Sequence, residues 1–209
     1  MGTASQIARI GREDAEELLR TFLPMFDWLY ERDIDYCLVG GLGVLAHALR
    51  AGEADFRATV DSDLMFDESF TNADFARAYL EVYASNPSYG VAVYEAVFGK
   101  GALEELEAEV QALVNASFVG ADEDLDGVST PDFDVVRNLN GLELKELERE
   151  EVDVLGHRVT VATTSQLLVM KERTIELLHA DFETSSRPQD FIDAARLRSL
   201  IESVRRRER

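Results

Sequence analysis

The sequence predicts an α/β fold of the α+β type: a small mixed β-sheet flanked by helices, with an inserted helical segment at about 70–130 and a C-terminal helical pair. Three observations predict it. A helix, a strand, a glycine turn, a second helix and a second strand follow one another within the first 66 residues; a hairpin pattern spans 151–161; and two helical patterns follow residue 162. We expect 1–162 to form the α/β core and 163–209 the helical pair packed on it.

The first third of the chain supplies the elements of the core. Between Arg12 and Tyr30, apolar residues recur at three- and four-residue spacing, which predicts an amphipathic helix. The apolar run Tyr36-Cys37-Leu38-Val39 predicts a buried strand. In order, the following elements are then expected: a strand at Ile34–Val39, a turn at Gly40-Gly41, a helix at Leu42–Leu49, a loop at 51–58 and a strand at Val60–Phe66.

The remainder alternates helical and extended patterns. Pro188 stands at the start of the last helical pattern, where proline is tolerated because the first N–H groups of a helix have no partner within it. Thr164 or Ser165 is expected to cap the preceding helix. The expected elements are helices at Ala73–Tyr83 and Ala102–Val114, a short strand at Phe133–Val136, a hairpin at Glu151–Val161 that turns at Gly156-His157, and helices from Thr164 to about Leu178 and from Pro188 onward.

Composition excludes several classes of function. The chain has 41 acidic and 21 basic residues and a net charge of −20, which disfavours binding to duplex DNA or to an anionic membrane. The longest apolar stretches are too short to span a bilayer, and the first ten residues lack a signal-peptide core, so a cytoplasmic location is expected. Cys37 is the single cysteine, which rules out an intrachain disulfide and predicts a buried free thiol.

The residues that indicate chemistry are Gly40-Gly41 and the pair Asp61 and Asp63. Alternate side chains of a strand share a face, so the two carboxylates are expected to point the same way. Such a pair can hold a hard divalent cation, and a glycine turn that opens a helix offers N–H groups to a phosphate. Each motif alone more often marks a solvated strand or an ordinary turn, but their order and separation favour a joint site for a metal and a nucleotide.

With these motifs the sequence resembles the nucleotidyltransferase superfamily that shares the DNA polymerase β-like palm fold, and within it the minimal nucleotidyltransferases and AbiEii-like toxins. The resemblance covers roughly 34–66 and 132–200. It is carried by Leu38-Val39-Gly40-Gly41, by Arg57-Ala58-Thr59-Val60-Asp61-Ser62-Asp63, by Phe133-Asp134-Val135-Val136, by Lys171 in a helix, and by Arg187-Pro188-Gln189-Asp190 followed by Asp193. The stretch from about 70 to 130 does not align.

The resemblance implies a role for individual residues. Asp61, Asp63 and Asp134 would bind Mg²⁺ or Mn²⁺, and Asp134 would help to deprotonate the acceptor hydroxyl. Asp132, on the same strand face, and Asp153, on another expected strand, are alternatives for the third carboxylate. The residues implied to bind the nucleotide are Gly40, Gly41, Arg57, Thr59 and Lys171. For Arg57 the alternative is to fix the loop before the strand, and for Lys171 it is an ion pair with Asp190 or Asp193.

The implied reaction transfers a nucleoside monophosphate from an NTP to a hydroxyl and releases pyrophosphate. The acceptor is left open between a small molecule, a tRNA and a protein, and a homodimer or an antitoxin is left open as a partner. A second hypothesis keeps the fold without catalysis, as a nucleotide-binding or protein-interaction module. The net charge of −20 favours a small or tightly docked acceptor over a long nucleic acid.

Overall fold

The fold is a mixed α/β arrangement built on one six-stranded sheet. A computed structural model describes residues 9–59, 62–71, 74–75, 78–79, 81–82, 127–129, 133–139, 141–180 and 188–207, without the side chains of 127–129, 134, 178–180, 188 and 207. The strand order is β5-β6-β4-β2-β10-β9. These strands are β2 (Tyr36–Leu38), β4 (Ser62–Phe66), β5 (Gly127–Ser129), β6 (Phe133–Val136), β9 (Arg149–Val154) and β10 (His157–Ala162).

Parallel and antiparallel pairings alternate across the middle of the sheet. Strand β2 runs antiparallel to β4, with Leu38 opposite Leu64, and parallel to β10. Strand β4 runs parallel to β6, and the β9–β10 and β5–β6 pairs are antiparallel. The end of β2 and the starts of β4 and β6 therefore lie at the same edge of the sheet.

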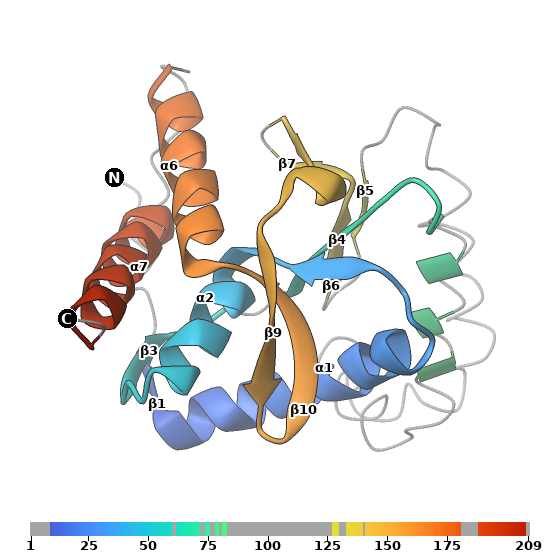
Figure 1. The fold of residues 1–209 in the computed structure, drawn as a ribbon, viewed down its shortest axis with the longest axis horizontal. Helices are drawn as coiled ribbons and strands as arrows, with labels where there is room; N and C mark the ends of the chain where they lie inside the picture. The colour runs from blue at the N-terminus through green and yellow to red at the C-terminus, as the bar shows by residue number, and fades with distance from the viewer. Residues whose placement is uncertain are drawn as a thin grey trace, which may run out of the picture.

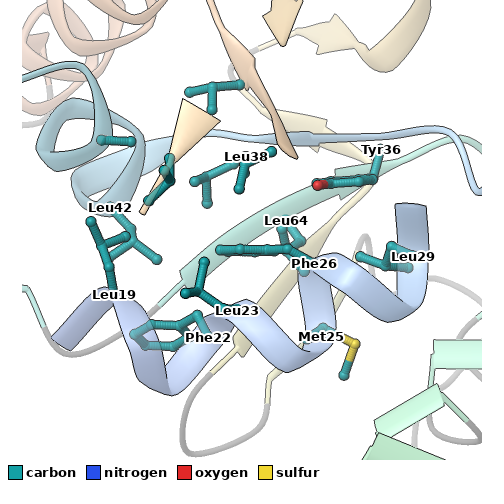
Figure 2. Close-up of a cluster of buried hydrophobic side chains, with 14 of the residues drawn as sticks. Leu19, Phe22, Leu23, Met25, Phe26, Leu29, Tyr36, Leu38, Leu42 and Leu64 are labelled. Carbon is teal, nitrogen blue, oxygen red and sulfur yellow. The ribbon is translucent and has the colours of Figure 1, made fainter. Parts of the chain in front are cut away.

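Helix α1 (Arg12–Glu31) packs against one face of the sheet through a large hydrophobic cluster. The side chains of Leu23 and Phe26 point toward sheet residues, among them Leu38 and Leu64, and Leu19 lies beside Leu42 of the neighbouring helix (Figure 2). Aromatic contacts join the two layers, since Phe22 meets Phe133 edge-on at 5.4 Å between ring centroids and Phe26 stacks on Tyr36 at 6.2 Å. This packing follows from the helical spacing of the apolar residues in the sequence.

The opposite face is covered by a smaller cluster in which Cys37 and Met65 from the sheet meet Leu167, Met170 and Leu197 from the C-terminal helices. These helices are α6 (Thr164–Ala180) and α7 (Pro188–Arg207), which lie against each other (Figure 1). Helix α2 (Gly40–Arg50) contributes to both clusters. The fold class expected from the sequence, including the C-terminal helical pair, is therefore confirmed.

Several local expectations were wrong or incomplete. Residues 51–58 are not all loop, because β3 (Asp55–Arg57) pairs antiparallel with the short strand β1 (Arg9–Gly11). A second two-stranded ribbon, β7 (Asn138–Leu139) with β8 (Leu142–Glu143), and the 3₁₀ turn Leu144–Glu146 were not anticipated. The cap of α6 is Thr163, whose Oγ1 accepts a hydrogen bond from the N–H of Gln166 at 3.2 Å.

The expected insertion at about 70–130 lies largely outside the described residues. Within it, the described positions 74–75, 78–79 and 81–82 are helical, in agreement with a helix at Ala73–Tyr83, whereas the helix expected at Ala102–Val114 is not described. Among the described helices, none combines the length and the apolar character needed to cross a membrane.

Candidate functional site

Gly40 and Gly41, which were expected to form a turn before a helix at Leu42–Leu49, are the first two residues of α2, which begins directly after Val39, the residue that follows β2. Val39 is extended, with φ −124° and ψ −160°, and its N–H donates to the carbonyl of Asp63 at 2.9 Å, so the turn is fastened to the start of β4. Gly40 then adopts a φ of +62°, a backbone conformation that favours glycine. The first hydrogen bond of the helix runs from the N–H of Gly43 to the carbonyl of Val39, at 3.2 Å. The N–H groups that precede Gly43 in the first turn therefore have no acceptor inside the helix.

Asp63 lies directly against this turn. A Cβ added to Gly40 would overlap the Asp63 carboxylate, so Gly40 is required both by its positive φ and by the close approach of Asp63. Asp63 alternates with Ser62 and Leu64 on β4, and it shares the face of Met65 rather than the aromatic face. The sequence analysis predicted a joint site at Asp63 and the glycine turn; the structure places the two side by side, and the function of the site stays a prediction.

The strand register brings a second aspartate position beside Asp63. In the parallel pair of β4 and β6, Asp63 is the partner of Asp134, and Leu64 is the partner of Val135. The side chain of Asp134 is not described, so the register gives its place in the sheet only. Asp61 and Asp132 fall outside the described residues.

The position of Asp153 is incompatible with a shared metal site. It lies on β9, the edge strand three places from β4, and strands are spaced by about 4.8 Å. Its Oδ1 also accepts the N–H of Gly156 at 3.1 Å in the β9–β10 turn. Among the side chains that the structure describes, no group of three or more histidine, cysteine, aspartate and glutamate residues is placed to hold a metal ion.

Arg57 and Thr59 border the second glycine. A Cβ on Gly41 would overlap Nη2 of Arg57 and would lie 2.7 Å from Oγ1 of Thr59, which is buried. The guanidinium of Arg57 forms a two-pronged pair with Asp193 on α7, with Nε–Oδ1 and Nη2–Oδ2 distances of 2.9 Å. Its Nη1 donates to the carbonyl of Ala58 at 3.0 Å. Arg57 therefore fixes the loop before β4, the alternative role considered for it.

Lys171 on α6 forms the ion pair that was its alternative role. Its Nζ lies 2.7 Å from Oδ1 of Asp190 and 3.2 Å from Oδ2 of Asp193. Only 14% of the Lys171 side chain is exposed, and Asp190 and Asp193 are buried. We call Arg57, Lys171, Asp190 and Asp193 the ion-pair cluster; it contains two cations and two carboxylates and joins β3, α6 and α7.

The link between Arg57 and Asp193 was missed by sequence reasoning. The two residues are separated by 136 positions, and an arginine before a strand carries no local signal of its partner. Asp190 and Asp193 were noticed as part of a motif, and an ion pair of either one with Lys171 was one of the two roles considered for that lysine. The spacing of three residues, which places both on one side of a helix, was the available signal.

Other titratable groups in the core are unsuited to acid–base chemistry at neutral pH. Burial raises the pKa of the Cys37 thiol to about 12, in agreement with the buried free thiol that was expected. Burial also lowers the pKa of His47, whose Nε2 lies 2.8 Å from the carbonyl oxygen of Ala162. Nε2 is therefore the donor and the imidazole is neutral, which suits a structural role.

Comparisons with known proteins identify no family for this chain. No protein-family model and no curated protein matches it. Among solved structures it is similar to an antigenic nucleotidyltransferase-like protein from Paracoccidioides brasiliensis, with 14% sequence identity and a TM-score of 0.45, over 91% of this chain and 78% of that chain. A similarity of this size assigns no role to any residue, so the site rests on its own geometry.

Proposed function

We propose that this protein is a metal-dependent nucleotidyltransferase, which transfers a nucleoside monophosphate from an NTP to a hydroxyl acceptor. The observation that supports it most is the contact between the Asp63 carboxylate and Gly40 at the start of α2, on a strand whose register pairs Asp63 with Asp134. Carboxylate oxygens are preferred ligands of Mg²⁺, and a helix start favours phosphate. Both features meet at one edge of the sheet.

In this proposal Asp61, Asp63 and Asp134 hold Mg²⁺ or Mn²⁺, and the carboxylate chemistry of these three positions suits such an ion. When bound, the ion neutralises charge on the triphosphate and on the leaving group. The N–H groups of Gly40 and Gly41 receive phosphate oxygens. The residues Arg57, Thr59 and Lys171 complete the nucleotide side of the site.

The reaction forms one bond and breaks one. The acceptor oxygen bonds to the α-phosphorus as the bond from that phosphorus to the bridging oxygen breaks, and pyrophosphate leaves with the electron pair. The hydroxyl proton passes to a carboxylate, for which Asp134 is proposed, and then to solvent. The protein contributes chiefly by positioning the reactants and stabilising the charge that develops.

The acceptor is proposed to be a small molecule or a tightly docked surface, since a net charge of −20 opposes the approach of a long nucleic acid. A role as an AbiEii-like toxin, a tRNA or protein acceptor, and an antitoxin partner are further versions of the same proposal. They rest on the family resemblance of the motifs alone.

One observation favours a second candidate, a nucleotide-binding module without catalysis. Both cations of the ion-pair cluster, Arg57 and Lys171, are already paired with buried carboxylates of the protein. A site that keeps its cations paired internally has less positive charge to offer the triphosphate in the transition state. In this candidate the turn binds the nucleotide but does not promote transfer.

A transfer assay separates the two candidates. The chain is incubated with each α-³²P-labelled NTP and Mg²⁺ or Mn²⁺, alone and with pools of cellular metabolites, RNA and protein. We expect labelled product with the wild-type chain and its loss, by at least about a thousandfold, in Asp63→Asn, because that carboxylate faces the proposed metal. Nucleotide binding without labelled product, over all acceptor pools, would favour the module.

A charge-matched control keeps the assay specific. Glu17→Gln on the exposed face of α1 removes one carboxylate away from the site and is expected to retain full transfer. Asp134→Asn is expected to abolish transfer as Asp63→Asn does, whereas Asp132→Asn and Asp153→Asn are expected to retain it. If Asp132→Asn lost transfer and Asp134→Asn kept normal transfer, Asp132 rather than Asp134 would be the third carboxylate of the proposed metal site.

A further inference from the structure

Helix α7 reaches the glycine turn through two linked contacts. Asp193 on α7 engages Nε and Nη2 of Arg57, both at 2.9 Å, and Nη2 of Arg57 in turn lies against the position that a Cβ on Gly41 would take. The side chains of Arg57 and Asp193 are 14% and 3% exposed, so this connection runs through the interior. Asp193 is thus connected to the site of the proposed function through one residue, Arg57.

The geometry of Arg57 makes this connection rigid. All three guanidinium nitrogens donate to protein oxygens, because Nη1 also reaches the carbonyl of Ala58 at 3.0 Å. A planar guanidinium that pairs with a carboxylate through two parallel hydrogen bonds has one orientation, which a point charge such as ammonium does not impose. Asp193 therefore determines where Nη2 stands relative to Gly41.

We propose that Asp193 is a positioning residue for the nucleotide site: by holding Arg57, it fixes the turn at Gly40-Gly41 and so sets the affinity for the metal–nucleotide. This inference rests on the proposed function. It gives α7 a role in the site, although Asp193 lies 136 positions along the chain from Arg57. Removing the carboxylate leaves the buried guanidinium without its partner, and Arg57 then leaves its place beside Gly41.

The chain supplies a matched control for Asp193→Asn. Asp190 lies on the same helix, and as whole residues Asp190 and Asp193 are 4% and 2% exposed. Asp190 pairs with Lys171 at 2.7 Å, whereas Asp193 forms the two-pronged pair with Arg57. Asp190→Asn makes the same change of charge in the same cluster but leaves the pair between Arg57 and Asp193 in place. The exposed α6–α7 pair of Glu172 with Arg198, at 2.6 Å, gives a second control, Glu172→Gln.

The first readout needs no nucleotide. Amide hydrogen–deuterium exchange is measured on the full chain, over peptides that cover 40–45. We expect at least tenfold faster exchange of the hydrogen-bonded amides from Gly43 onward in Asp193→Asn, because the N–H of Gly43 donates to the carbonyl of Val39 across the turn. Rates within twofold of wild type are expected in Asp190→Asn and Glu172→Gln. A purely structural role of Asp193 in helix packing would accelerate exchange in α7 and α6 and leave 40–45 unchanged, which would overturn the inference.

The second readout is affinity. Calorimetric titration with Mg²⁺ and the α,β-methylene analogues of ATP, GTP, CTP and UTP avoids any need for turnover. We expect Asp193→Asn and Arg57→Gln each to weaken binding at least tenfold, and the double variant to bind no more weakly than either, since both remove one connection. Losses that multiply in the double variant would overturn the inference.

A variant that keeps the charge guards against loss of folding. Arg57→Lys retains a cation beside Asp193 but cannot form the two-pronged pair, so we expect a folded chain with weakened analogue binding. Normal affinity in Arg57→Lys would overturn the inference while the proposed function stood. A wild-type chain that binds no analogue would instead overturn the proposed function, and with it the role of Asp193 in affinity.

Discussion

The two faces of the sheet are built on different principles. The face under α1 buries large aromatic and aliphatic side chains, among them Phe22, Phe26 and Phe133, which are at most 2% exposed. The face under α6 and α7 buries a smaller apolar cluster, and next to it lie the ion-pair cluster and the half-buried Asp63. The face under α1 buries apolar surface, which has no directional requirement. The face under α6 and α7 depends on individual hydrogen bonds and ion pairs and on the positive φ of Gly40.

Under the proposed function, this difference separates stability from function within a single sheet. Alternate residues of β4 serve the two purposes, since Leu64 and Phe66 enter the aromatic face while Asp63 faces the glycine turn. Substitutions on the first face should change the free energy of unfolding and spare the chemistry of folded molecules. Substitutions on the second should damage the site by more than their cost in stability explains.

The largest expected effect on stability comes from truncation of Phe26, which is fully buried and stacks on Tyr36. We expect Phe26→Ala to lower the free energy of unfolding by about 3–5 kcal/mol, measured by urea denaturation, because it leaves a cavity in the aromatic face. Phe191→Ala removes the same atoms from a side chain that is 42% exposed and should cost less than about 1 kcal/mol. Equal costs would contradict the burial of Phe26 in the aromatic face.

Gly40→Ala tests the second face. The new Cβ must accept a φ of +62° and overlaps the Asp63 carboxylate, so we expect a loss of about 1–2 kcal/mol from the backbone and about 1–3 kcal/mol from the overlap, together with loss of analogue binding. Gly52→Ala is the matched control, because Gly52 has a φ of +83° and no atom within 4 Å of the added Cβ. It should show the backbone cost alone and retain binding.

The same contrast explains what the sequence could predict. Helix α1 and strands β2, β4, β6, β9 and β10 were expected close to their observed bounds, because apolar periodicity reports directly on which residues are buried. The start of α7 followed from Pro188, whereas α2 begins at Gly40, two residues before the expected Leu42. The ribbon of β1 and β3 was missed because each strand has three residues, and its pairing joins segments that lack any alternation pattern.

The candidate site was predictable only as far as its motifs are local. Gly40 and Asp63 were expected in one site because the order and separation of the glycine pair and the aspartate pair match a family pattern. The pair of Arg57 with Asp193 was not expected, since it depends on the tertiary placement of α7. The register of Asp63 with Asp134 required the strand order, which the sequence leaves open.

A smaller effect is expected from pH, through His47. Burial lowers the pKa of this imidazole below its ordinary value of about 6.5, so the unfolded chain binds a proton that the folded chain resists. The neutral imidazole thus contributes stability above the unfolded pKa, and that stability is lost as pH falls from about 6.5 toward the lowered value, by at most about 1.4 kcal/mol per pH unit. Urea denaturation of wild type and His47→Gln between pH 7.5 and 5 measures it. The variant should lose less stability over that interval, and parallel curves would contradict a buried neutral His47.

The smallest effect concerns Cys37, which lies on the second face but belongs to its apolar part. Burial raises the pKa of its thiol to about 12, so thiolate is scarce at pH 8 and the sulfur is shielded. We expect no labelling by a maleimide at pH 8 in the folded chain and full labelling in urea, with Cys37→Ala transferring nucleotide as the wild type does. Rapid labelling of the folded chain would show that reagents reach the sheet between α6 and β4. The apolar cluster around Cys37 would then be accessible to solvent, rather than closed packing beneath α6 and α7.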